Sequence, residues 1–189
     1  MAKCYGLKKG ENGTKNINVM LPTNGTPVNA VAAVGTLTLA TQPTAGDTMT
    51  IGTKVYTFVA AGSADTNGEI SVGTDLATAK TALIAAINGT DSFNIANTLA
   101  SAGTFSTNDL PITAKTKGLA GSSIVTTETF TAVGNVFNAT TLGATTEGVN
   151  GTIGVAGEQY IDDSYRYIAL QNNTISDNYW RRVSLGSAY

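Results

Sequence analysis

The residues of this chain that could carry out chemistry are few, and their clearest group lies between positions 158 and 189. Asp162 and Asp163 form the only adjacent pair of acidic residues. Two carboxylates can act as general acid and base or hold a cation, but neighbours on a strand face opposite ways and no third ligand stands at a defined offset. We therefore interpret this pair as solvated carboxylates in a turn.

Arg181 and Arg182 follow the single tryptophan, Trp180. An arginine pair beside an indole ring can stack on a base or clamp a phosphate. Acidic residues of the same region offset these charges, and the whole chain has a net charge of −2, so no broad basic surface supports nucleic acid as a partner. We expect the arginines to pair across strands or to contact a partner protein. The offsetting acids are Glu158, Asp162, Asp163 and Asp177.

A second group of charges lies near the start of the sequence. Lys3, Lys8 and Lys9 could contact nucleic acid, yet a few lysines on an extended arm are usually solvated. We retain them as candidate contacts to a partner protein. Cys4 is interpreted as an incidental free thiol.

The absence of histidine and the single cysteine remove the parts of most common active sites. A Ser-His-Asp site, a Cys-His site and an imidazole metal ligand are excluded, and one thiol cannot form an intramolecular disulfide or a thiolate cluster. Most common enzyme mechanisms therefore lack their parts in this chain, and we expect no metal and no cofactor. No run of about 18 apolar residues is present, and no apolar signal segment follows Met1, so neither membrane insertion nor classical secretion is expected.

Composition indicates a β-rich protein with a neutral surface. The chain has 189 residues, of which 42% are hydrophobic and only 13% charged, and it contains 31 threonines and 21 glycines. Threonine is β-branched and favours the half-buried surface of a sheet, whereas glycine supplies turns. We predict an α+β, β-rich fold, with an antiparallel sheet or sandwich, one helix packed on it, an extended N-terminal arm and a C-terminal β-hairpin.

The strongest local patterns are a hairpin and a helix. Alternating residues 48–51 and 55–59 flank a short glycine-containing turn, and we expect the aromatic face, with Tyr56 and Phe58, to be the buried one. Apolar residues at helical spacing predict a helix over about 75–88, capped by Thr74 or Asp75 and ended by Asn88-Gly89. Further strands are predicted within residues 36–40, Phe93–Ala100, Leu110–Lys115 and Ser123–Thr131.

Four segments follow from these patterns. Residues 1–34 are predicted to form an extended N-terminal arm with one strand-like run, Ile17 to Leu21, and residues 35–131 a β-rich domain with one helix. Residues 132–157, rich in glycine, threonine and asparagine, are predicted to be a linker or long loop. Residues 158–189 hold the tryptophan, all three arginines and five of the seven tyrosines, and are predicted to form a β-hairpin.

The predicted β-rich domain resembles a domain that recurs in structural proteins of tailed-bacteriophage particles, including capsid decoration and tail-associated proteins. The residues that carry this resemblance are Gly35–Leu39, Pro43–Phe58, the helix at 75–88, Thr113–Ile124 and Thr126–Thr129. The last segment is similar to a short module that ends many such proteins, through Gly157–Tyr160, Tyr165–Ala169 and Trp180–Leu185. Together the two resemblances cover about 130 of the 189 residues.

The resemblance implies a non-enzymatic virion protein. Its leading form is a decoration, or cement, protein made in the cytoplasm of the bacterial host, which binds the outer capsid surface and bridges capsid subunits. The major capsid protein and further copies of this chain would be the partners. The expected contact residues are Lys3, Lys8, Lys9, Tyr165, Tyr167, Trp180, Arg181 and Arg182, and burial of the aromatic ones in the protein's own core is an equal alternative.

Two further interpretations remain open. The protein could belong to the tail tube, the neck or a head fibre of the same particle. It could also be a carbohydrate-binding module on a host-facing surface, with Tyr165, Tyr167 or Trp180 as a stacking platform for a sugar.

Overall fold

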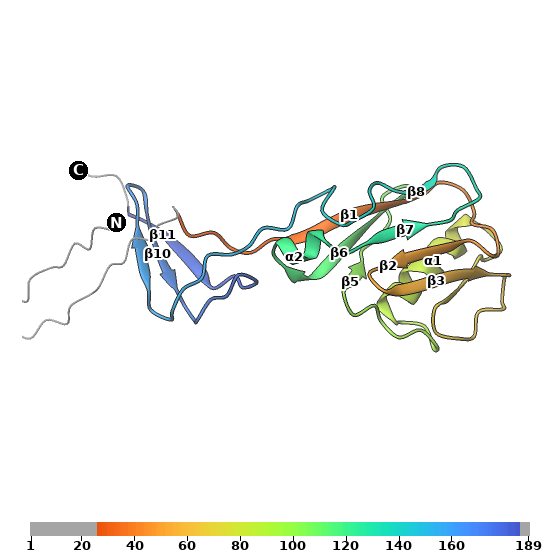
Figure 1. The fold of residues 1–189 in the computed structure, drawn as a ribbon, viewed down its shortest axis with the longest axis horizontal. Helices are drawn as coiled ribbons and strands as arrows, with labels where there is room; N and C mark the ends of the chain where they lie inside the picture. Colours follow the sequence, from red (N-terminus) through yellow and green to blue (C-terminus); the bar gives the residue numbers. More distant parts are fainter. Residues whose placement is uncertain (1–25, 186–189) are drawn as a thin grey trace, which may run out of the picture. The chain divides into compact units, whose positions relative to one another are not determined.

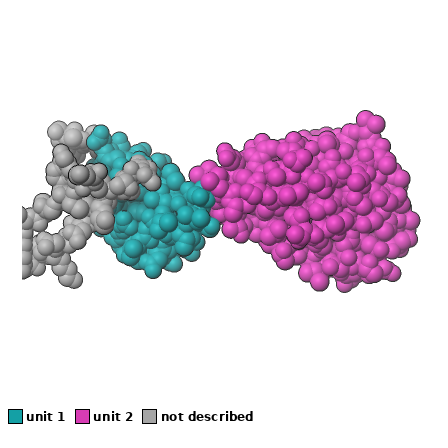
Figure 2. Space-filling model, viewed as in Figure 1, with its two compact units in different colours: residues 1–30, 150–189 teal, residues 31–149 magenta. Residues whose placement is uncertain are grey.

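The computed structural model describes residues 26–185, and these residues form two compact units (Figure 2). Unit 2 is one continuous stretch, Val31–Val149, whereas unit 1 combines the two ends of the chain, of which residues 26–30 and 150–185 are described. Four residues discussed above, Lys3, Cys4, Lys8 and Lys9, and the run from Ile17 to Leu21 lie outside the described residues.

Unit 2 contains two four-stranded sheets and two helices (Figure 1). One sheet has the order β5-β6-β1-β8 and is antiparallel throughout; the other has the order β4-β3-β2-β7, with only β3 and β4 parallel. The elements are β1 (Ala32–Leu39), β2 (Thr48–Ile51), β3 (Lys54–Val59), β4 (Glu69–Ser71), α1 (Leu76–Asn88), β5 (Ala100–Ala102), β6 (Asp109–Lys117), α2 (Leu119–Ser122), β7 (Thr126–Glu128) and β8 (Asn135–Phe137). The fold of the chain is α+β and β-rich, as predicted.

The predicted hairpin is confirmed, and so is the choice of its buried face. β2 and β3 pair antiparallel, with Met49 opposite Tyr56 and Ile51 opposite Lys54. Tyr56 and Phe58 are fully buried, whereas Val55 on the other face is 53% exposed. The aromatic side chains remove more apolar area from water than valine does, which favours this orientation of the strand.

Helix α1 begins and ends where its caps predict. Asp75 is the N-cap, because its side chain accepts a hydrogen bond from the Thr78 N–H at 2.8 Å while the Thr78 hydroxyl accepts one from the Asp75 N–H. Gly89 ends the helix in the left-handed conformation, with φ at 63°. The apolar stripe of α1 is buried through Leu83 and Ile87.

One hydrophobic core lies between the two sheets of unit 2. β1 alternates strictly, so that Leu37 and Leu39 point into the core while the threonines between them point outward. Helix α1 packs against β4 and β5, which are edge strands of the two sheets. The helix therefore covers the core along one edge of each sheet, the edge formed by β4 in one and by β5 in the other.

Unit 1 is built on a three-stranded antiparallel sheet in the order β11-β10-β9. Its strands are β9 (Gln159–Ile161), β10 (Tyr165–Ala169) and β11 (Trp180–Ser184). The pairing predicted between the two aromatic segments is present, with Tyr167 opposite Arg182 and Ala169 opposite Trp180. Strand β9 was not expected from the sequence, and it places Tyr160 beside Tyr167.

The strand predicted over Phe93–Ala100 is not formed, and only Ala100–Ala102 pairs, as β5. The reason is that the side chains of Asp91 and Asn97 take up the local main-chain N–H groups, those of Phe93 and Asn94 at the first and those of Leu99 and Ala100 at the second. Such local side-chain bonds compete with a sheet ladder. The buried Asn94 side chain instead accepts from the distant Gly68 N–H and so ties this loop to the start of β4. The strand predicted over Ser123–Thr131 is reduced to β7.

The boundaries of the predicted segments also differ from the structure. Ala32–Val34, assigned to the arm, belong to β1, and residues 132–149, assigned to the linker, belong to unit 2 and contain β8. Leu142, in the same predicted linker, is buried in the unit 2 core. Residues 150–157 join residues 26–30 in unit 1, so the terminal module is more than a hairpin. The glycines that suggested a linker instead allow close packing, as at Gly154 against Trp180.

Candidate protein-interaction site

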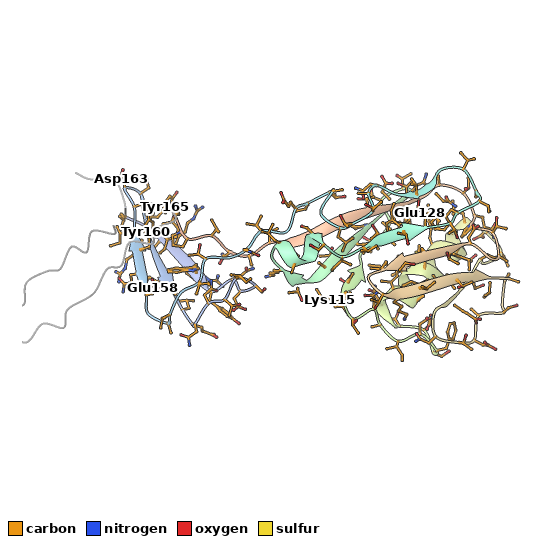
Figure 3. All side chains as sticks on the ribbon, viewed as in Figure 1. Lys115, Glu128, Glu158, Tyr160, Asp163 and Tyr165 are labelled. Carbon is orange, nitrogen blue, oxygen red and sulfur yellow. The ribbon has the colours of Figure 1, made fainter. Side chains whose placement is uncertain are left out.

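The sheet of unit 1 has two unlike faces, which its register defines. Tyr165, Tyr167 and Ala169 of β10 share one face with Trp180 and Arg182 of β11. The other face carries Ile161, Arg166, Ile168, Arg181 and Val183. Figure 3 labels Tyr160 and Tyr165 on this sheet.

Trp180 belongs to the core of unit 1. Only 4% of its surface is exposed, its indole Nε1–H donates to the carbonyl of Thr152 at 2.8 Å, and a Cβ on Gly154 would lie 2.6 Å from its ring. Tyr167 is 7% exposed, and its ring centroid is 5.6 Å from that of Tyr160 and 6.2 Å from that of Tyr165. Tyr167 and Trp180 are therefore core residues, which answers the question that the sequence left open for them.

Arg182 and Tyr165 form a pair at the margin of this core. The guanidinium of Arg182 lies over the half-buried Tyr165 ring, 4.6 Å from its centroid, in a cation–π arrangement. Arg181 points to the opposite face and donates to the Asn178 carbonyl at 3.1 Å. Both arginines are exposed, so these two predicted contact residues are accessible within the described part of unit 1.

Asp162 organises the turn between β9 and β10. Its Oδ1 accepts from the N–H groups of Ser164 at 2.8 Å and Tyr165 at 2.6 Å. The Ser164 bond above all, followed by those of Tyr165 and Tyr167 and the charge of Arg182, holds the pKa of the Asp162 carboxyl below its usual value. Asp163 beside it is exposed. The two residues lie in a turn, as interpreted from the sequence, and hydrogen bonds to the main chain of that turn hold the Asp162 carboxylate in place.

A hollow of about 500 Å³ lies beside β11 in unit 1. One wall is the stretch from Thr26 to Asn29, and the other is formed by Trp180, Arg181 and Arg182, with Tyr167 at the aromatic face. No local pattern predicts the first wall, because it lies more than 150 positions from β11 and has no periodicity of its own. Asn29 Nδ2 reaches the Trp180 carbonyl at 3.5 Å, which joins the two walls at one end.

The outer face of the β2-β3-β7 sheet in unit 2 is lined by threonine. Thr48 lies opposite Thr57, and Thr50 lies opposite Thr127, all on the face that points away from the core. The hydroxyls of Thr48 and Thr129 are 2.9 Å apart. The charged residue Glu128, labelled in Figure 3, is the neighbour of Thr127 along β7. This is a β-branched surface on a regular sheet, and Glu69 of β4 lies beside Thr57 on the same face.

Within residues 26–185, no group of three or more acidic or cysteine side chains is placed to hold a metal ion. None of the helices in that range is both long and apolar enough to cross a membrane. Comparisons with protein-family models, curated proteins and solved structures gave no match to this chain. The interpretation of the site therefore depends on its geometry and on the resemblance described above.

Proposed function

We propose that this chain is a non-enzymatic structural protein of a tailed-bacteriophage particle, where it binds the outer capsid surface as a decoration protein and bridges capsid subunits. The observation that carries the proposal is that the aromatic residues of unit 1 are buried while the residues of its edge strand are exposed. Tyr167 and Trp180 hold the unit together, while Arg181, Arg182 and Val183 of the edge strand β11 are exposed for contact. Exposed arginines beside an aromatic cluster are typical of protein–protein contacts.

Unit 2 supports the same role in a different way. Its core is continuous and the outer face of β2, β3 and β7 is lined by threonine, so it offers a firm surface of low charge that can lie against neighbouring subunits. Many weak contacts of this kind add up across a repeating lattice, because each attached unit raises the effective concentration of the next. The partners are the major capsid protein and other copies of this chain.

The carbohydrate-binding interpretation gains less support from the geometry. A sugar stacks on an exposed aromatic ring, whereas Trp180 and Tyr167 are buried and Tyr165 is covered by the Arg182 guanidinium. A place in the tail, the neck or a fibre remains an outcome of the experiment below.

The experiment is co-sedimentation of the purified full chain with capsids of the phage that encodes it, prepared without the chain. We expect saturable binding that the double variant Arg181→Glu/Arg182→Glu weakens by about tenfold or more. Gln171→Glu, which adds a negative charge at an exposed position of unit 1 outside β11, is the matched control and should bind as the unchanged chain does. Binding to tails or tail tubes instead, or no binding to any particle, contradicts the capsid role.

A further inference from the structure

Strand β11 is an edge strand, and the main chain of Arg182 faces outward from it. The Leu170 N–H donates to the Tyr179 carbonyl, and the Leu185 N–H donates to the Ser164 carbonyl. In an antiparallel ladder this alternation makes Arg181 and Val183 the hydrogen-bonded partners of β10. The N–H and carbonyl of Arg182 therefore point away from the sheet, and nothing within residues 26–185 pairs with them.

The outward edge of β11 borders the hollow described above. Its volume of about 500 Å³ is bounded by the edge strand on one side and by Thr26 to Asn29 on the other. Trp180 and Tyr167 give it an aromatic floor. An exposed sheet edge next to such a hollow is the arrangement that accepts an extended peptide as an additional strand, with main-chain bonds for affinity and a pocket for alternate side chains.

The positive charges beside this edge favour an acidic peptide over a neutral or basic one. Arg181 and Arg182 both line the hollow, and guanidinium groups prefer carboxylates in two-pronged geometry. Residues 1–25, which precede the Thr26 wall in the sequence, contain four lysines and one glutamate, a net charge of +3. The chain's own neighbouring segment therefore does not match these arginines in charge, and neither does a second β11, which would oppose arginine to arginine.

We propose that the outer edge of β11 and the adjoining hollow bind an extended acidic segment of a partner protein by strand addition. The Arg182 main chain pairs with the main chain of that segment, and its carboxylates pair with the guanidinium groups of Arg181 and Arg182. The inference stands apart from the capsid role, because it specifies the chemistry of a ligand and needs no particle to be tested.

Trp180 provides the readout, since it is the only tryptophan in the chain and lines the hollow. The full chain is titrated with an acetylated and amidated peptide of three Thr-Glu-Glu repeats, called the Thr-Glu peptide, while Trp180 fluorescence is recorded. Its glutamates lie on both faces of an added strand, as Arg181 and Arg182 lie on both faces of β11. We expect a saturable change. The same peptide N-methylated at every residue cannot donate to the Arg182 carbonyl in any register. That peptide and a peptide of three Thr-Lys-Lys repeats should both bind about tenfold more weakly or worse.

Variants separate the two parts of the interaction in the protein itself. Arg181→Ala/Arg182→Ala should weaken binding of the Thr-Glu peptide about tenfold and leave the N-methylation effect in place, because the edge remains. Gln171→Ala, at an exposed position outside β11, is the control and should bind as the unchanged chain does. Unaltered Trp180 emission in the absence of peptide verifies that each variant is folded.

Four results overturn the proposal. They are no fluorescence change up to millimolar Thr-Glu peptide, equal binding of the N-methylated peptide, a thymidine octanucleotide that binds as tightly as the acidic peptide, and self-association of the free chain in sedimentation that the peptide does not reverse. The third would make the edge a nucleic-acid site, and the fourth would make it an interface between copies of this chain.

Discussion

Asn97 is the residue that does most to position the loop between α1 and β5. It is 1% exposed, its Nδ2 donates to the Ile51 carbonyl at 3.2 Å, and it lies 3.3 Å from the Tyr56 hydroxyl. Its Oδ1 accepts from the Leu99 and Ala100 N–H groups at 2.9 and 3.1 Å. One side chain thus links the end of β2, the core aromatic of β3 and the start of β5.

We predict that Asn97→Ala lowers the free energy of unfolding by about 1–3 kcal/mol, because it leaves the buried Ala100 N–H without a partner. Thr98→Ala, at the exposed neighbouring position, should change it by less than about 0.5 kcal/mol. Urea unfolding followed by circular dichroism measures both. Equal effects of the two substitutions would contradict the role given to Asn97.

Asp162 gives unit 1 a dependence on pH. Because its pKa in the folded protein is lower than in the unfolded chain, its contribution to stability is complete above its ordinary value of 3.8 and is lost as the pH falls through the lowered value. We predict that the urea midpoint reported by Trp180 falls between pH 7 and pH 3, and that Asp162→Asn reduces this fall. Asp163→Asn should leave it unchanged. An equal fall in Asp162→Asn and the unchanged chain would contradict the assignment.

At the scale of elements, the end of α1 depends on a glycine for two separate reasons. Gly89 has φ at +63°, and a Cβ at this position would lie 2.3 Å from the Ala96 nitrogen. Gly62 has φ at +77° but no atom within 4 Å of such a Cβ. The pair therefore distinguishes the cost of the backbone conformation from the cost of close packing.

We predict that Gly62→Ala lowers the free energy of unfolding by about 1–2 kcal/mol through its backbone conformation alone, and that Gly89→Ala lowers it clearly further. Thermal unfolding followed by circular dichroism provides the comparison. A Gly89 variant no less stable than the Gly62 variant would show that the loop around Ala96 moves aside without lowering the free energy of unfolding.

Elements with strong local signals could be predicted from the sequence, and elements that depend on distant partners could not. Helix α1 and the β2-β3 hairpin each carry their own caps, turn and apolar pattern, so their bounds were predicted closely. The three-residue strand β8 exists only because it pairs with β1, about 100 positions away. The loop at 93–99 has the residues of a strand, but its asparagines supply hydrogen bonds that periodicity does not register.

The candidate site follows the same rule. Its arginines and aromatics stand out in composition, and the pairing of β10 with β11 was predicted from their alternation. Their burial was not predictable, because it depends on Gly154 and Thr152 in a stretch that reads as a linker. The wall from Thr26 to Asn29 comes from the other end of the chain and has no counterpart in any local pattern.

At the scale of the whole molecule, the two units have separate cores. The buried cluster of unit 2 lies entirely within Val31–Val149, and both four-stranded sheets are built from strands of this unit alone. The cluster of unit 1 is centred on Tyr167, Ala169 and Trp180. Unit 1 also needs both chain ends, since the Ala30 N–H donates to the Asp177 carbonyl at 3.2 Å.

We predict that a fragment of residues 31–149 unfolds cooperatively by itself, because it retains its complete core. A fragment of residues 150–189 should show the Trp180 emission of an exposed indole, because the hydrogen bonds from Val28 and Ala30 are missing. Circular dichroism and fluorescence of the two fragments measure this. Emission from the second fragment identical to that of the full chain would show that the N-terminal stretch is dispensable for unit 1.

The central claim, that this protein assembles with others and transforms nothing, is tested most directly by imaging. Cryo-electron microscopy of the phage particle at a resolution that separates subunits would locate the chain in place. We predict density for both units on the outer capsid surface, with β11 against a neighbouring subunit. Particles that lack the chain altogether would contradict the account.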